Sequence, residues 1–548
     1  MYTRRSFLKT AAIGALGLSP TIRALGARRQ ASGYFSLHPF IENHPEAVFI
    51  MPTSIVDKMD AETKLKAGLT FSRSVFVPGD ESGIPLSTSI PVKINLKTTG
   101  SDRFPLRDII GTIADPSFCE GVFEGMKELG IEGRQIHIRE NPRGDSFGPY
   151  GIIDMTQRTG VDLRTDFQGE VGNGMEQGRD FNWTDVPNGV FFRKIAQLEP
   201  INTPGSWMLN ISKFKAHGMG MTLCSKNLQG MLTRPFTHLC ARFNDDMGLS
   251  PYLQDNALTS IAQSYEHHLK LNIIPRWDRP GDNGGNWQEA WSHRTLDHLS
   301  VTPCGLNIIE GIYGRDGDCG NIGPHPFDED SVGDPVSSPD VTARDFMSNY
   351  IIFGKDIFRT DIVGHWLGGH EPGNFGFFHL AIERGMSNAL DPRKIPVYRW
   401  ENGSATLTPV TDFKRTPLLT YYLQRDYNGG IEPQYHLCDE PFDYSFVDGI
   451  EKPKLPEKPE VIVLSQNMLN PSNPCASIEY RLPMSGFVRL EIRDDRGRIL
   501  AVPVDDFRVG GAHMALWDTN NCPPGAYTYR LRINGFEQKG TLALRKPG

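Results

Sequence analysis

Lys213, Lys215 and His217 are the residues whose types and spacing point most directly to chemistry, because one residue separates each from the next. In a β-strand this period of two places all three side chains on one face. Two ammonium groups beside a side chain that titrates near neutral pH can bind an anion and transfer a proton. The alternative is a solvated edge strand with scattered lysines and a structural histidine.

The residues after this strand extend the same pattern. A glycine-rich turn is followed by Thr222, which is expected to cap a helix that carries Lys226 and Asn227 in its first turns. A helix N-terminus beside lysines attracts a carboxylate, a phosphate or a developing enolate. The expected catalytic residues are His217, Lys215 and Lys226, and the expected anion-binding residues include Lys213 and Asn227.

A divalent metal ion is a candidate cofactor, with Glu310, Asp361 and His365 as its ligands. Glu310 ends an apolar strand before a glycine-rich loop, which is the usual place for a functional carboxylate in an open α/β sheet. Asp361 and His365 are four residues apart and would share one face of a helix. In the alternative, Asp361 caps a helix and the histidine satisfies local hydrogen bonds.

Composition and missing motifs argue against several classes of function. The formal net charge of −8 over 548 residues makes nucleic acid an unexpected partner, since phosphate binding needs a basic surface. The eight cysteines form no C-x-x-C motif, so a cysteine-ligated iron–sulfur cluster is not expected. No G-x-G-x-x-G motif follows a strand, and no Walker-type motif occurs. These gaps disfavour dinucleotide sites and Walker-type phosphate sites.

The first 26 residues are expected to form an export signal. Arg4 and Arg5 precede a Phe-Leu-Lys sequence and a short apolar run, a pattern that resembles a twin-arginine signal. The apolar run is too short to span a bilayer, and no later segment reaches transmembrane length. We therefore expect the twin-arginine translocase as a partner and a periplasmic, secreted or cell-surface location, with no membrane span in the mature chain.

The rest of the chain is expected to form a large α/β domain and a small β module. In the α/β domain, apolar strands at 90–96 and 135–140 flank an amphipathic helix at 116–130. This β-α-β order predicts an open mixed sheet with its sites at the carboxyl ends of strands. The expected segments are an α/β domain at 33–450, a linker at 451–460 and a β-sandwich module at 461–548.

The linker and the module have separate signatures. Prolines recur among charged residues at 451–460, which favours an extended linker. Short alternating strands separated by turn signals then indicate an antiparallel immunoglobulin-like sandwich. Cys475 and Cys522 both fall in this module, and we expect them to form a disulfide in an oxidising compartment.

The module also resembles the flagellar-hook-capping-like immunoglobulin module and the related C-terminal sorting domains of secreted proteins. The resemblance is carried by the segments 470–474, 478–483 and 525–531. It implies either a signal for passage across an outer membrane or a module for structural or surface attachment. Because the general secretory pathway normally precedes the outer-membrane route, the twin-arginine pattern favours the attachment role.

Residues 92–386 resemble the domain of unknown function 362 family. The resemblance is carried by Lys213-x-Lys215-x-His217-Gly218, by Thr222-x-x-x-Lys226-Asn227-x-x-Gly230, by Lys93-x-Asn95 and by the segments 306–317, 361–369 and 380–385. It implies a fold and a candidate site more than it implies a reaction. In that site Lys93 and Asn95 join the anion-binding residues. Some relatives carry ferredoxin-type clusters, from which this chain departs by lacking the closely spaced cysteines.

Two functions remain from the sequence. One is an exported, metal- or cofactor-dependent enzyme that acts on an anionic small molecule through the lysine and histidine residues. The other is a non-catalytic protein that binds an anionic ligand or cofactor and is attached to a surface or assembly by its C-terminal module. The gathering of lysines, a histidine and carboxylates at expected strand ends favours the enzyme.

Overall fold

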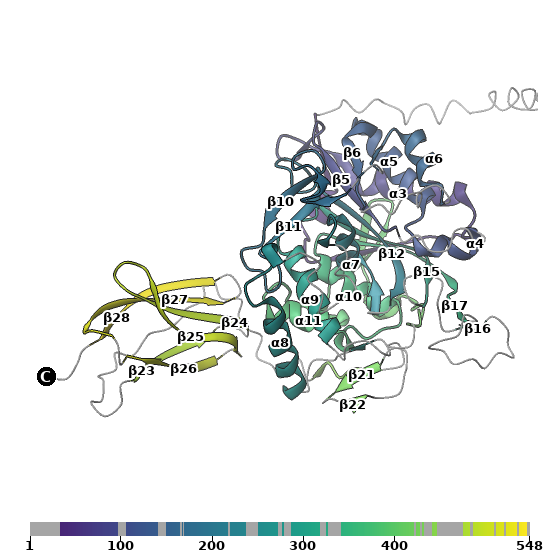
Figure 1. Ribbon diagram of the computed structural model, residues 1–548. Helices are drawn as coiled ribbons and strands as arrows, with labels where there is room; N and C mark the ends of the chain where they lie inside the picture. The colour runs from purple at the N-terminus through teal and green to yellow at the C-terminus, as the bar shows by residue number, and fades with distance from the viewer. Residues whose placement is uncertain are drawn as a thin grey trace, which may run out of the picture.

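The computed structural model describes most of the chain from residue 33 to residue 544 (Figure 1). The described ranges are 33–96, 106–140, 150–164, 167, 169–217, 220–236, 250–271, 277–278, 286–317, 325–326, 341–420, 424–427, 430–431, 441–445, 475–482, 486–508, 511–519, 522–533 and 536–544. The expected export signal at 1–26 and the expected linker at 451–460 lie outside these residues.

A ten-stranded mixed sheet organises the main domain. Its main path runs β20 (Ser404–Leu407), β19 (Val397–Glu401), β2 (Val48–Pro52), β18 (Asp345–Gly354), β15 (Leu306–Arg315), β12 (Leu209–His217), β5 (Ile90–Ile94), β6 (Ile136–Ile138) and β7 (Asp162–Leu163). The strands from β15 to β7 are parallel to one another, whereas β18 is antiparallel to both of its neighbours. The short strand β13 (Gly220–Thr222) turns back antiparallel on β12.

Helices cover both faces of this sheet, each over its own apolar core (Figure 1). Leu209 and Ile211 of β12 face the first core, whereas Phe214 and Ala216 face the second. The first core packs under α3 (Ala61–Val75), α5 (Pro116–Lys127) and α6 (Ile152–Thr159). The second packs under α7 (Cys224–Asn227), α9 (Asn286–Leu299), α10 (Ile357–Leu367) and α11 (Gly376–Glu383). A strand covered on both faces is normally apolar, so the buried lysines and asparagine of β12 are its unusual feature.

The predicted β-α-β order is confirmed by β5, α5 and β6. The side chain of Asp115 accepts hydrogen bonds from the backbone N–H groups of Ser117 and Phe118, and Pro116 occupies the first turn of α5. An aspartate cap followed by proline starts a helix because both suit the unpaired first turn. β5 and β6 then pair in parallel, as their connection through a helix requires.

Smaller elements complete the main domain. One helix, α8 (Ala257–Leu271), packs against α9. The others are α2 (Pro39–Glu42), α4 (Leu106–Ile109), β1 (Tyr34–Leu37), β3 (Phe76–Pro78), β4 (Ile84–Pro85), β8 (Glu170–Val171), β9 (Gly174–Met175), β10 (Phe181–Asp185), β11 (Lys194–Leu198), β14 (Trp277–Asp278), β16 (His325–Pro326), β17 (Val341–Thr342), β21 (Gln424–Tyr427) and β22 (Gly430–Ile431). Within the described residues, no helix combines the length and the apolar character needed to cross a membrane.

The C-terminal region is an all-β module of two antiparallel sheets. One sheet pairs β23 (Cys475–Leu482) with β26 (Gly511–Asp518). The other has the order β25 (Ile499–Arg508), β24 (Gly486–Arg493), β27 (Gly525–Ile533) and β28 (Phe536–Leu544). Both contribute to one apolar core that includes Ile478, Leu490 and Trp517. Cys475 starts β23 opposite Asp518, but its side chain is outside the described set, so its disulfide with Cys522 stays a prediction.

Candidate functional site

The two lysines of β12 point to the same side of the sheet. Lys213 Nζ lies 2.6 Å from Glu310 Oε2 on β15, and 3.3 Å from the centre of the Tyr313 ring. Lys215 Nζ donates a hydrogen bond of 2.7 Å to the backbone oxygen of Thr112. The backbone N–H of Asp115, three residues further along, donates to Glu310. These contacts agree with the period of two that the sequence predicts for Lys213 and Lys215.

Lys213 belongs to a buried charge cluster that we call the Lys213 cluster, made of Lys64, Asp115, Lys213, Glu310 and Tyr313. Asp115 Oδ2 lies 2.6 Å from Lys64 Nζ and accepts a hydrogen bond of 2.7 Å from the Tyr313 hydroxyl. Burial lowers the pKa of Lys213 and raises the pKa of Glu310, and each charge opposes the shift of the other. The ammonium of Lys213 and the carboxylate of Glu310 therefore stabilise each other's charge in a buried site.

A second cluster lies on the opposite face, and we call it the Asn227 cluster: Lys93, Asn95, Glu140, Asn210 and Asn227. Lys93 is ion-paired with Glu140 and donates 2.9 Å to Asn227 Oδ1, which also accepts from the Asn95 amide at 3.2 Å. Asn227 Nδ2 donates 2.8 Å to Asn210 Oδ1 and reaches the backbone oxygens of Lys93 and Ile211. Asn227 thereby ties the ends of β5 and β12 together.

The sheet separates residues that the sequence assigns together to anion binding. Val92 and Ile94 face the first core, so Lys93, between them, faces the second core. Lys213 and Lys215 alternate with Phe214 and Ala216, which face the second core, so both lysines face the first core. The structure thus brings Lys93, Asn95 and Asn227 together on one face, and leaves Lys213 and Lys215 on the other.

Three partners of these residues are absent from the sequence-based assignment. Glu140 lies two residues after the end of β6, and functional carboxylates often follow the carboxyl end of a parallel strand. Asp115 precedes a helix, so its position in the sequence indicates a helix cap and no further role. Asn210 lies in the same strand as the lysines and pairs in register with Lys93. Only the Glu140 signal could have been recognised from the sequence.

His217 and Lys226 are the half-buried members of the predicted site. His217 ends β12, and Lys226 lies in the short helix α7. Near them, Asn95 Oδ1, Thr222 Oγ1 and Ser225 Oγ are buried and have no hydrogen-bond partner in the part of the chain that the structure describes. Thr222 pairs in register with Lys215, and opposed residues of an antiparallel pair share a face. A buried hydroxyl without a partner therefore lies on the same side as Lys215.

The three expected metal ligands are not brought together. Glu310 accepts hydrogen bonds from Asp115 and Ile312 in addition to its ion pair with Lys213. His365 packs against Phe375 and Phe378, and burial holds its pKa well below the usual range. Across the described ranges, no group of three or more histidine, cysteine, aspartate or glutamate side chains could hold a metal ion.

Asp361 has a different role, because it caps α7. Its two carboxylate oxygens accept hydrogen bonds of 2.8 Å from the backbone N–H groups of Cys224 and Ser225. Thr222 was expected to cap this helix, but the Thr222 side chain makes no such bond, and the expectation is wrong. Burial raises the pKa of Asp361 to about 7, while the hydrogen bonds oppose the rise. The first N–H groups of α7 are therefore already satisfied by a carboxylate of the protein itself.

We expect Asp361→Ala to lower the free energy of unfolding by about 0.5–2 kcal/mol, the usual effect of losing a helix cap. Urea denaturation measures the change. Asp356→Ala is the matched control, since Asp356 likewise accepts from two backbone N–H groups at the start of α10. Equal stability of Asp361→Ala and the unmodified protein would show that the cost of burying the carboxylate cancels its two hydrogen bonds.

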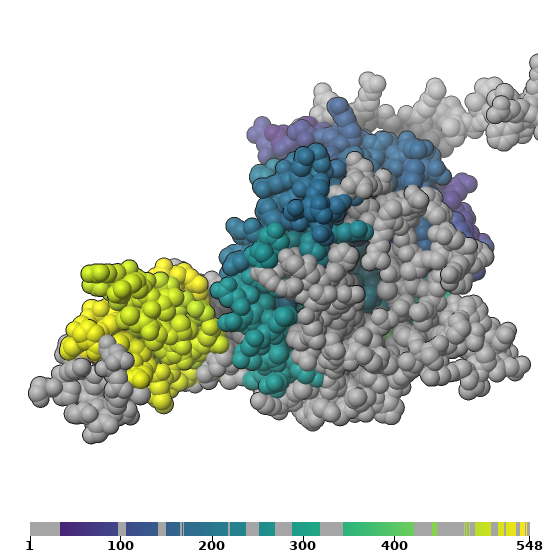
Figure 2. All heavy atoms as spheres, viewed as in Figure 1, coloured from purple at the N-terminus to yellow at the C-terminus, as the bar shows by residue number. Residues whose placement is uncertain are grey.

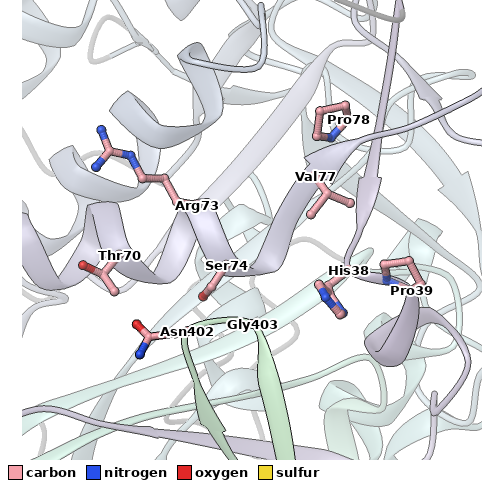
Figure 3. A pocket seen from close by; sticks show the side chains of 9 residues that line it. All are labelled: His38, Pro39, Thr70, Arg73, Ser74, Val77, Pro78, Asn402 and Gly403. Atoms are coloured by element: carbon pink, nitrogen blue, oxygen red, sulfur yellow. The ribbon is translucent and has the colours of Figure 1, made fainter. Parts of the chain in front are cut away.

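An open cavity of about 870 Å³ lies elsewhere on the main domain. Figure 3 shows Thr70, Arg73 and Ser74 of α3 on one side of it and the turn at Asn402 and Gly403 on another. Its lining contains none of the residues predicted for the site. Arg73 is already engaged by Glu128, with Nε 2.7 Å from Oε2. The cavity therefore gives no support to the lysine and histidine site.

Taken together, the fold and the two clusters define a mixed α/β protein whose polar residues are buried near the carboxyl ends of neighbouring parallel strands. The family model described as a domain of unknown function (DUF362) matches residues 90–364, and the chain belongs to this family. The matched segment starts with β5 and ends within α10, so it contains the Asn227 cluster entirely and most of the Lys213 cluster. No curated protein and no solved structure matches the chain.

Proposed function

We propose that the protein is an enzyme that binds an anionic small molecule beside the ends of β12 and α7 and transfers a proton on it. His217 is the general acid or base, and Lys215 and Lys226 supply positive charge. The observation that carries the proposal is the buried hydroxyl of Thr222, which shares a strand face with Lys215 and has no hydrogen-bond partner among the described residues. An oxygen of an anionic ligand would satisfy that hydroxyl beside an ammonium group.

The contacts divide the predicted site residues into two roles. Lys93 and Lys213 are each ion-paired and at most 1% exposed, so we assign them to positioning. Asn227 has the same role, because its amide is used in bonds to β5 and β12. Asn95 donates to Asn227 on the same face, so we assign it to positioning as well.

The test is a comparison of binding and turnover in matched variants. Small carboxylates and inorganic phosphate are screened by calorimetry, and the best ligand is then used in a proton-transfer assay. Lys215→Met and Lys226→Met should each weaken binding, whereas Lys127→Met, which removes a surface lysine paired with Glu124, should not. Binding that is unchanged in both site variants would overturn the proposal.

His217→Ala should lower turnover by about 10²- to 10⁴-fold, the usual contribution of a general acid or base, and leave the dissociation constant unchanged. Steady-state kinetics and calorimetry on the same preparations measure the two quantities. A parallel loss of binding and turnover would instead make His217 a ligand-binding residue.

A second candidate function is capture of the same anion without catalysis, by a protein attached to a surface or assembly through its C-terminal module. The observation that favours it is the exposure of Met514 and Leu516 on β26, at 60% and 61%. Exposed apolar side chains on one strand suit attachment to a partner. We also propose export by the twin-arginine pathway to the periplasm or cell surface, supported by the pattern at Arg4 and Arg5.

A further inference from the structure

His268 joins three helices through its two ring nitrogens. The residue lies on α8, and its Nδ1 atom is 2.9 Å from Glu289 Oε1 on α9. Its Nε2 atom is 3.0 Å from Glu383 Oε2 on α11. A carboxylate only accepts hydrogen bonds, so both ring nitrogens must carry a proton to make these two contacts. With both glutamates ionised, the geometry therefore favours a positively charged imidazolium between two carboxylates.

Several titratable and polar groups of the described residues surround His268. On α8 itself, Ser264 donates 2.5 Å to Glu289 Oε1, and the His267 ring lies beside the His268 ring. On α9, His293 Nε2 is 3.4 Å from the same Glu289 oxygen. Burial by itself lowers the pKa of His268, but the charges of Glu289 and Glu383 outweigh burial and raise the pKa to about 9.

The outer side of α8 faces the C-terminal module. Strand β25 packs against α8, and Asn256, next to the first residue of α8, has its Nδ2 atom 3.4 Å from Asp505 Oδ2 of β25. The charge of Asp255 also acts on Arg489 of β24. Figure 2 shows the module against the surface that α8 forms. The helix therefore lies between the C-terminal module on one side and α9 and α11, which His268 contacts, on the other.

We propose that His268 is a proton-dependent latch: its doubly protonated ring holds α8 on α9 and α11, and loss of one proton releases α8 together with its contact to the C-terminal module. When the ring loses a proton, the fully buried Glu289 and the partly buried Glu383 lose the positive charge that neutralises them, which is unfavourable. The released helix would then lose the support that fixes its position against β25.

The direction of the pH effect follows from the two states of the ring. In an unfolded segment histidine titrates near pH 6.5, whereas in the folded latch the pKa is about 9. Below pH 6.5 the latch stabilises the docked helix fully. Between pH 6.5 and 9 the docked state holds one proton more than the released state, so its stability falls as pH rises. Above pH 9 the contribution of the latch is lost.

Hydrogen exchange followed by mass spectrometry tests the latch on the full chain without any ligand. After correction for intrinsic exchange rates, protection of α8 peptides in the unmodified protein should fall by about tenfold per pH unit between pH 6.5 and 9. His268→Gln should show low protection with no such slope. His44→Gln is the control, because His44 Nδ1 contacts the backbone oxygen of Phe40 and no carboxylate among the described residues, and it should behave as the unmodified protein.

Glu383→Gln provides a milder second variant, since the Glu383 side chain is 15% exposed and its neutral replacement keeps an acceptor oxygen. Removing this charge should move the loss of α8 protection to lower pH. An unchanged midpoint, or flat protection of α8 in the unmodified protein, would overturn the latch. Peptides of β25 should lose protection with α8, and their constancy would reject the coupling to the module.

Discussion

Lys213→Met should lower the free energy of unfolding of the main domain by about 3–5 kcal/mol, the cost of leaving a buried charge without its partner. Lys213 and Glu310 are both fully buried, and their charged atoms are 2.6 Å apart. Methionine has a similar length but no charge, so Glu310 would keep its backbone hydrogen bonds and lose its counter-ion. Urea denaturation followed by the fluorescence of main-domain tryptophans measures the change.

A double-mutant cycle separates this cost from lost packing. Lys213→Met combined with Glu310→Gln should recover a large part of the stability, because glutamine can still accept a backbone hydrogen bond and carries no charge. The surface pair Lys127 and Glu124 is the control, and Lys127→Met should cost less than about 1 kcal/mol. If the double variant were as unstable as the sum of the single variants, the ion pair would not be the source of the effect.

Gly230→Ala should destabilise the main domain by about 1–3 kcal/mol, as overpacking of a tight site does. A Cβ atom at this position would lie 2.2 Å from Glu140 Oε1 and 2.6 Å from Lys93 Cε. Lys93 cannot move away cheaply, because it is also hydrogen-bonded to Asn227 and to the backbone oxygen of Ile94, and Glu140 is ion-paired with Lys93. The same denaturation measurement applies, and the anion affinity should fall with the stability of the Asn227 cluster.

Gly525→Ala is the control for this substitution. An added Cβ atom at Gly525 would meet no atom within 4 Å, so the change should leave stability within about 0.5 kcal/mol. If Gly230→Ala behaved in the same way, Glu140 and Lys93 would have to adjust at no cost, and the Asn227 cluster would not be a rigid support. The pair of glycines thus distinguishes a steric requirement from a general glycine effect.

The internal contacts change how the lysines contribute to the proposed chemistry. An ammonium that is already neutralised by a carboxylate attracts an external anion weakly, which is why Lys93 and Lys213 serve better as supports than as ligands. Lys226 and His217 are half-buried, and Lys215 lies beside the Thr222 hydroxyl, so these three are the residues through which we propose that an anion is bound. The variants of Lys215, Lys226 and His217 therefore test the function, and those of Lys213 and Gly230 test its framework.

The local part of the fold could be predicted from the sequence by itself. Period-two and period-3.6 patterns depend only on the geometry of one strand or one helix, so β5, α5 and β6 occur where those patterns predict them. The same reasoning placed Lys213 and Lys215 on one face of β12, and their contacts agree. The α/β class followed from the order of these elements.

Only the tertiary structure decided which side chains meet. Lys93 and Lys213 lie on opposite faces of the sheet. Which alternate residues of a strand face which core is decided only when the strand packs against the helices. Asp361 reaches the start of α7 from a helix more than a hundred residues later, and this contact makes it a helix cap. Such pairings depend on which strands become neighbours and on how their registers align. Sequence spacing determines positions within an element, whereas the partners across elements are set by the packing of the whole domain.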